Sequence, residues 1–172
     1  SATSGIWHLY GYDQPAIADY YVAMTSDVAL PAGSYPYLHF NHAYGFDDYE
    51  TTMYDGGVVE YSTNGDSSWN DAGSLFTHNG YDGTISTCCS NPLGGRQAFG
   101  GESNGYISSR LNLSSLAGQN VRFRFRIGTD STVDDLGWFI DDVRIYTCPS
   151  PEANVYLPIV LKNYCSPVQV VQ

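Results

Sequence analysis

The sequence is poor in positive charge and in long apolar runs. Its 172 residues include 7 Lys and Arg against 18 Asp and Glu, which gives a formal net charge of −11. A strongly acidic chain is repelled by phosphate backbones and by anionic membrane surfaces. The longest apolar run near the C-terminal end, residues 155–161, contains Pro158 and is too short to cross a membrane. We therefore predict no nucleic-acid partner and no membrane span.

Helical periodicity is also missing, since no segment shows it over about ten residues or more. Strand patterns are frequent instead. In residues 121–127 apolar side chains alternate with Arg, which predicts a strand with one face in the core and the other facing solvent or a partner. Residues 37–44 alternate similarly, and Asn-Gly and Gly-Gly pairs mark turns. Together with 15 Tyr and 18 Gly, these patterns predict an all-β fold, an antiparallel jelly-roll or β-sandwich of two sheets.

The chain divides near Pro149. Residues 1–148 hold the strand patterns and form the predicted domain, which includes a long loop-rich insertion at residues 70–105. Residues 149–172 begin as a Pro-containing linker and continue as a short, β-prone tail. No signal peptide is recognisable, which leaves two expectations: a mature chain after cleavage, or a domain cut from a longer protein.

Four cysteines are present: Cys88, Cys89, Cys148 and Cys165. An even number in a Lys-poor, Tyr-rich chain indicates two disulfides and an oxidising compartment outside the cytoplasm. Because adjacent cysteines rarely bond to each other, we expect Cys88 and Cys89 each to pair with one of the other two, and both connectivities stay open. The alternative is a zinc site, but the chain has no C-x-x-C pair.

Residues 137–145, Gly-Trp-Phe-Ile-Asp-Asp-Val-Arg-Ile, form the segment around which the other strands are expected to be organised. Aromatic and β-branched residues predict a strand. Strict alternation would place Asp141 on the buried face with Val143 and Ile145, unless a bulge intervenes. A buried carboxylate needs a cation, an arginine or several N–H donors. The last core strand is therefore predicted to carry a charged group together with its partner.

Two motifs have catalytic counterparts. Residues 101–105, Gly-Glu-Ser-Asn-Gly, match the G-x-S-x-G pattern of hydrolases, but that serine acts between a strand and a helix, and here a strand pattern follows. His39 and His42 lie three positions apart in one strand, so they face opposite ways and cannot chelate a metal together. We therefore expect no catalytic residues and no enzyme activity.

A series of short motifs, taken in order, resembles the MAM-like jelly-roll domain. That domain is appended to secreted bacterial metallopeptidases of the immune inhibitor A type and to other secreted or anchored bacterial proteins. The resemblance implies a two-sheet jelly-roll that serves as an accessory module and not as a catalyst. The motifs are Leu38-His39-Phe40 with His42, residues 55–62, Trp69, residues 99–106, Leu113-Ser114, Ala117-Gly118, residues 122–126 and residues 137–143.

The resemblance also implies a structural cation. Related MAM domains bind one through the acidic pair at the last strand, here Asp141 and Asp142, with help from an acidic residue near the first strand. That opening strand is not recognisable in residues 1–20. The tail after Pro151 is therefore a candidate for the missing strand, in its own chain or in a neighbour's.

Calcium is the predicted cofactor, because hard cations take about six to eight oxygen ligands and clustered carboxylates supply them. One alternative is that Asp141 or Asp142 forms an ion pair with an arginine of the strand at residues 121–127. Another is that the excess of acidic residues serves only to keep the protein soluble. The candidate ligands are Asp141, Asp142, Asp47 and Asp55, with Asp48 and Glu50 nearby in sequence, and the candidate arginines are Arg122, Arg124 and Arg126.

These observations predict a secreted, non-catalytic module located outside the cell or at its surface. Its expected partners are other extracellular protein domains or further copies of itself. One alternative is a self-assembling structural subunit of a fibre or surface layer that donates its tail as a strand. Another is a carbohydrate-binding module, in which the Tyr and Trp residues of positions 7–21 stack on glycan rings.

Overall fold

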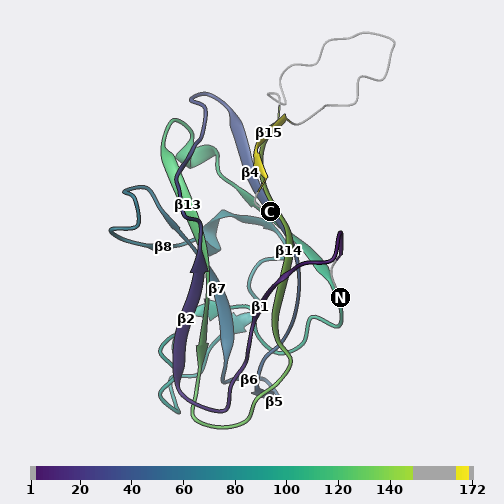
Figure 1. The fold of residues 1–172 in the computed structure, drawn as a ribbon. Helices are drawn as coiled ribbons and strands as arrows, with labels where there is room; N and C mark the ends of the chain where they lie inside the picture. The colour runs from purple at the N-terminus through teal and green to yellow at the C-terminus, as the bar shows by residue number, and fades with distance from the viewer. Residues whose placement is uncertain (1–2, 149–165, 171–172) are drawn as a thin grey trace.

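The computed structural model describes residues 3–148 and 166–170, and two antiparallel sheets face each other in it (Figure 1). The first sheet has the order β1 (Leu9–Gly11), β14 (Gly137–Cys148), β4 (Tyr35–Gly45), β12 (Ile107–Asn112) and β9 (Phe76–His78). The second has the order β2 (Ala18–Ala23), β13 (Asn120–Thr129), β7 (Gly56–Ser62) and β8 (Asn70–Asp71), and β3 (Val28–Ala29) also pairs with β13. The predicted all-β sandwich is confirmed.

Smaller elements complete the described part of the chain. Two short ribbons pair β5 (Asp48–Tyr49) with β6 (Thr52–Met53) and β10 (Gly83–Thr84) with β11 (Gln97–Ala98). Single 3₁₀ turns span Gly73–Leu75 and Ser114–Leu116. Within residues 3–148 and 166–170, no helix has the length and apolar character that crossing a membrane requires.

The C-terminal strand β15 (Ser166–Val170) pairs antiparallel with β14 of its own chain. It lies against residues 144–147, while β1 lies against residues 138–140, so the two share the edge of β14 that faces away from β4. The tail therefore supplies a strand to its own chain, which was one of the two predicted arrangements. Donation of this strand to a neighbour stays a prediction, and the predicted linker lies outside the described residues.

The core lies between the two sheets, where the predicted alternation of β13 is confirmed. Val121, Phe123, Phe125 and Ile127 are all at most 7 % exposed, whereas the intervening arginines are partly exposed. Aromatic rings from both sheets meet there edge to face, with Phe125 and Trp138 at 5.6 Å between ring centroids. Such pairs add to the free energy that burial of the rings already contributes.

A β-bulge resolves the conflict in residues 137–145. The register against β4 shifts between Asp141 and Arg144, and Asp142 has a left-handed backbone with φ of 51°. One extra residue on β14 restores Val143 and Ile145 to the buried face that Trp138 and Ile140 occupy. Both carboxylates of the Asp pair therefore leave the core, and strict alternation was the wrong assumption for this strand.

The arginines of β13 do not pair with Asp141 or Asp142, so that alternative is wrong. Arg124 and Arg126 contact Glu60 of the neighbouring strand β7, and Arg126 also binds Asp19 of β2 at 2.7 Å. The cause is the sheet order: β13 lies in the second sheet between β2 and β7, whereas the Asp pair belongs to β14 in the first sheet.

The predicted disulfide pairing of Cys88 and Cys89 with the later cysteines is also wrong. The two form a disulfide with each other in a tight turn in which Cys89 and Ser90 both have φ of 66°. The insertion of residues 70–105, which contains Cys88 and Cys89, joins the sandwich near the start of β7, where Phe99 forms a bridge with Gly57. Cys148 is the last residue of β14 and lies at the opposite end of the sandwich. At about 3.3 Å per residue the 12-residue strand separates these ends by roughly 35 Å. Cys148 is disulfide-bonded as well, and Cys165 lies outside the described residues.

Candidate functional site

The predicted metal ligands fall into two separate places. Asp141 and Asp142 lie in the bulge of β14, while Asp47 and Asp55 lie at the end of the sandwich where β4 ends and β7 begins. Asp48 and Glu50 are exposed in the β5–β6 ribbon. The structure therefore does not bring the four predicted ligands together at one site.

The Asp pair of the bulge already has hydrogen-bond donors from the N-terminal segment. Asp141 Oδ2 accepts from the backbone N–H of Thr3 at 2.6 Å, and Asp142 Oδ1 accepts from the Ser4 hydroxyl at 2.5 Å. Asn41 donates to Asp142 Oδ2 at 2.9 Å. Burial is the largest single influence on Asp141 and raises its pKa, but the hydrogen bonds from Thr3, Ser4 and the backbone of Asp142 together outweigh it and lower the pKa. Hydrogen bonds from Ser4, Thr3 and Asn41 lower the pKa of Asp142. The pair is thus ionised and bonded without a metal.

The second place gathers carboxylates from four chain segments, because the antiparallel register puts the relevant strand ends side by side. Gly45 pairs with Gly137, Gly11 with Trp138, and Gly128 with Gly56. The residues just beyond these ends therefore share one end of the sandwich. We call this group the acidic centre: Asp13, Asp47, Asp55 and Asp130.

Hydrogen bonds tie the segments of the acidic centre together. The backbone N–H of Asp47 donates to Asp13 Oδ2 at 3.0 Å, and the backbone N–H of Asp130 donates to Asp55 Oδ1 at 2.6 Å. The amide of Asn91, from the insertion, donates to the carbonyl oxygens of Tyr54 and Gly128, each at 2.8 Å. One carboxylate oxygen from each of Asp47, Asp55 and Asp130 lies within 4.8 Å of the others.

Burial sets the electrostatics of the acidic centre. Asp13 and Asp55 are 0 % exposed and Asp130 is 1 % exposed, while Asp47 is half-buried. Burial raises the pKa of Asp13, and burial together with the neighbouring Asp13 carboxyl raises the pKa of Asp55. Burial likewise raises the pKa of Asp47. These groups are costly to ionise without a positive charge nearby.

Two members of the acidic centre, Asp13 and Asp130, were not predicted from the sequence. Asp130 follows the strong strand pattern of residues 121–127 by three positions, and Asp55 precedes the strand pattern of residues 58–62 by three positions. Residues at the ends of neighbouring antiparallel strands meet at one end of a sheet, so this position was a usable signal. For Asp13 there was no such signal, because β1, the strand before it, is only three residues long.

The two histidines face opposite ways, as predicted. His42 is 0 % exposed and lies in a chain of hydrogen bonds: Trp138 Nε1 donates to His42 Nδ1 at 3.0 Å, and His42 Nε2 lies 2.8 Å from Ser109 Oγ. Because Nδ1 accepts, Nε2 must carry the proton and donate to Ser109, whose hydroxyl in turn donates to the carbonyl of Asn79. His39 is half-buried on the other face, where its Nδ1 lies 3.2 Å from Arg144 Nε.

Ser103 of the G-x-S-x-G match has a local role. Its hydroxyl oxygen accepts from the backbone N–H of Tyr44 at 2.8 Å and lies 2.9 Å from the carbonyl oxygen of Gly105. Strand β12 follows, starting at Ile107, in agreement with the strand pattern. The hydroxyl thus joins a loop to β4.

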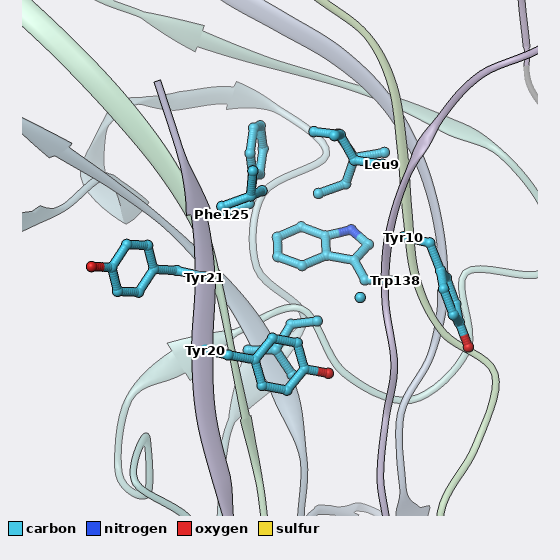
Figure 2. A pocket seen from close by; sticks show the side chains of 10 residues that line it. Leu9, Tyr10, Tyr20, Tyr21, Phe125 and Trp138 are labelled. Carbon is cyan, nitrogen blue, oxygen red and sulfur yellow. The ribbon is translucent and has the colours of Figure 1, made fainter. Parts of the chain in front are cut away.

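An aromatic cleft of about 200 Å³ opens between the sheets along the edge strands β1 and β2. Figure 2 shows the indole of Trp138 at its centre, with Leu9 and Phe125 on one side and Tyr20 on the other. The rings of Tyr10 and Tyr21 point outward on the two flanks (Figure 2). None of the lining residues is charged; they are Leu9, Tyr10, Gly11, Tyr20, Tyr21, Val22, Phe125, Ile127, Trp138 and Ile140.

The floor of the aromatic cleft is rigidly held. The Trp138 indole is anchored by its hydrogen bond to His42. A Cβ atom on Gly57 would lie 2.5 Å from the indole ring, so β7 needs glycine at this position. The hydroxyl of Tyr20, which lines the cleft, is buried and has no hydrogen-bond partner among the described residues. The cleft therefore combines a fixed apolar floor with a polar group that is not yet satisfied.

No known protein-family model matches this chain, and no curated protein sequence matches it either. The resemblance to MAM-like domains therefore stays a prediction.

Proposed function

We propose that the chain is a non-catalytic extracellular module that attaches the protein carrying it to a partner through the aromatic cleft. The observation that supports this is the exposure of apolar side chains around the cleft: Tyr10 is 52 % and Tyr21 is 58 % exposed. The segment leading into β1 adds Ile6 and Trp7, which are 81 % and 82 % exposed. Soluble proteins seldom leave such residues grouped on the surface without a binding role.

The position of the cleft supports a binding role. β1 and β2 are the outermost strands of their sheets, and the cleft lies between them. Side chains that stand on paired strands are held more precisely than side chains on loops. The Cys88–Cys89 disulfide fits an extracellular location, because disulfides persist in oxidising compartments.

A saccharide is a second, more specific candidate for the ligand. Flat rings flank a cleft without charged lining, and an uncharged sugar presents an apolar face that stacks on such rings. The Tyr20 hydroxyl would supply a hydrogen bond to a sugar hydroxyl group. A protein partner would use the same rings as anchors, since Tyr and Trp dominate protein interfaces.

Retention on immobilised partners tests the proposal. Purified protein is passed over insoluble polysaccharides (cellulose, chitin and peptidoglycan) and over surfaces coated with extracellular matrix proteins. We expect retention on one of these supports. Substitution Tyr10→Ala combined with Tyr21→Ala should weaken it at least about tenfold, because each exposed ring that anchors a ligand contributes about 1 kcal/mol or more.

The matched control is Tyr49→Ala, because Tyr49 is 68 % exposed in β5 and does not line the cleft. Retention on polysaccharide alone would favour the carbohydrate-binding function, and retention on protein alone would favour adhesion. Unchanged retention of the double variant would contradict the role of the cleft.

A further inference from the structure

We infer that the acidic centre binds one calcium ion that joins four loops at this end of the sandwich. The inference is independent of the ligand of the aromatic cleft. It also differs from the metal site that the sequence suggested, because it excludes Asp141 and Asp142 and includes Asp13 and Asp130.

The first argument is the pair of unsatisfied oxygens in the acidic centre. Asp13 Oδ1 and Asp55 Oδ2 have no hydrogen-bond partner among the described residues. Both residues are 0 % exposed, so bulk water does not reach these oxygens either. The two carboxyl groups are near neighbours, since the Asp13 carboxyl contributes to the raised pKa of Asp55. Buried polar atoms are nearly always bonded, and two facing carboxylate oxygens accept but do not donate. Either a cation between them or a proton that one carboxyl group donates to the other would satisfy both oxygens.

The second argument is the lack of an internal counter-charge. In the described ranges, every ion pair of an arginine involves Asp19, Asp27, Glu60, Asp66 or Asp71, and none reaches the acidic centre. Ionised carboxylates buried together without a cation would repel each other strongly in a low-dielectric environment. The positive charge must therefore come from outside the described residues, or the carboxyl groups must stay protonated.

The third argument is the chemistry of the donors, which selects calcium. All the side chains are carboxylates, and no His or Cys belongs to the group, so the site does not suit zinc. Calcium takes about six to eight oxygens in flexible geometry, whereas magnesium demands a near-ideal octahedron and retains several waters. Four carboxylates from four loops, one of them only half-buried, match the looser requirement.

The position of the site defines what the ion would do. Asp13 follows β1, Asp47 follows β4, Asp55 precedes β7 and Asp130 follows β13, so both sheets contribute. An ion at this point would connect the ends of the two sheets and fix the loop that joins β1 to β2. The aromatic cleft lies between those same two strands, so calcium would also hold its walls in place.

Calcium titration of metal-free protein tests the inference. After dialysis against EDTA and then buffer, calcium chloride is titrated by calorimetry, and thermal unfolding is recorded with and without the ion. We expect one calcium per chain and a rise in Tm of roughly 5–10 °C at a hundredfold excess over Kd. Sodium chloride at matched ionic strength should not reproduce the rise, which separates binding from screening of the net charge of −11.

Variants locate the ion. Asp55→Asn and, separately, Asp130→Asn should weaken calcium affinity more than roughly 100-fold, since even the neighbours of metal ligands contribute about 10–100-fold. Asp47→Asn tests a third proposed ligand. Because Asp47 is only half-buried, this variant is the least expected to lose its fold. The control is Asp66→Asn, which removes the same charge at an exposed, left-handed position. It should bind calcium as the unmodified protein does.

Two outcomes would overturn the inference. One is that calcium produces neither heat of binding nor a shift in Tm beyond that of sodium. The other is that Asp55→Asn and Asp130→Asn bind calcium as tightly as the unmodified protein, because the ion would then lie elsewhere.

Discussion

Two groups of buried carboxylates in this molecule have opposite surroundings. Glu60 of β7 is 3 % exposed, yet its oxygens contact three arginines: Arg96 at 2.6 Å, Arg126 at 3.3 Å, and Arg124. Burial alone would raise the pKa of Glu60, but the hydrogen bonds and charges of Arg96 and Arg124 outweigh it and lower the pKa. In the acidic centre the same burial raises the pKa of Asp55, because only another carboxyl group and a few N–H donors lie nearby.

The comparison shows that burial alone does not decide whether a carboxylate is stable in a protein. At Glu60 the chain carries its own counter-charge on a neighbouring strand, so the group needs nothing from outside. At the acidic centre no arginine of the described residues forms an ion pair, so the buried carboxylates are best stabilised by a bound cation. The first group therefore contributes to stability, while the second is suited to binding.

The largest expected effect comes from Glu60→Gln. This change leaves three guanidinium groups around a neutral amide, and breaking a buried ion pair costs about 3–5 kcal/mol of the free energy of unfolding. Urea unfolding at pH 7 measures the loss. The control is Asp71→Asn. The side chain of Asp71 is 40 % exposed and pairs with Arg96, so its loss should lower the free energy of unfolding by less than about 1 kcal/mol. Equal stability of the Glu60 variant and the unmodified protein would show that the arginines do not need this carboxylate.

A third buried ionisable group, His42, extends the comparison to a base. Burial lowers the pKa of His42 to about 3, below the value of about 6.5 in the unfolded chain. Below pH 6.5 the folded state binds fewer protons than the unfolded state, so stability falls as the pH falls towards 3. The loss from His42 between pH 7 and pH 5 should be about 2 kcal/mol.

Two measurements check the effect of His42. Its ring signals in NMR should not titrate between pH 8 and pH 5 in the folded protein, whereas they should titrate near pH 6.5 in urea. The stability difference between the unmodified protein and His42→Gln should shrink by about 2 kcal/mol from pH 7 to pH 5. A titration midpoint of the His42 ring signals above pH 6 in the folded protein would mean that burial does not hold this ring neutral.

The smallest effect is expected from Asp141→Asn. The Asn side-chain oxygen can still accept from Thr3 and Ser4, so the free energy of unfolding should change by less than about 1 kcal/mol. Calcium affinity, measured by the same calorimetric titration, should stay the same. Loss of calcium binding in this variant would move the site to the bulge of β14 and would remove the contrast drawn above.

Local pattern was enough for much of the fold. The alternation of apolar residues and Arg in β13 and the alternation around His42 in β4 were legible because side chains of a strand point to opposite faces at every step. The bulge at Asp142 was not legible, since an extra residue depends on how β14 pairs with β4 and leaves no local mark in sequence. The Cys88–Cys89 disulfide was missed because adjacent pairs are uncommon and because the distance to Cys148 is a tertiary property.

The sequence by itself determined the all-β class and the buried faces of β4 and β13, because strand alternation is a local property. The tertiary structure alone decided which charges meet. Asp13, Asp47, Asp55 and Asp130 are far apart in the sequence, and only the antiparallel register brings them to one end of the sandwich. Because electrostatic energies depend on distance and burial, the acidic centre and the arginine-bound Glu60 could be distinguished only in the folded molecule.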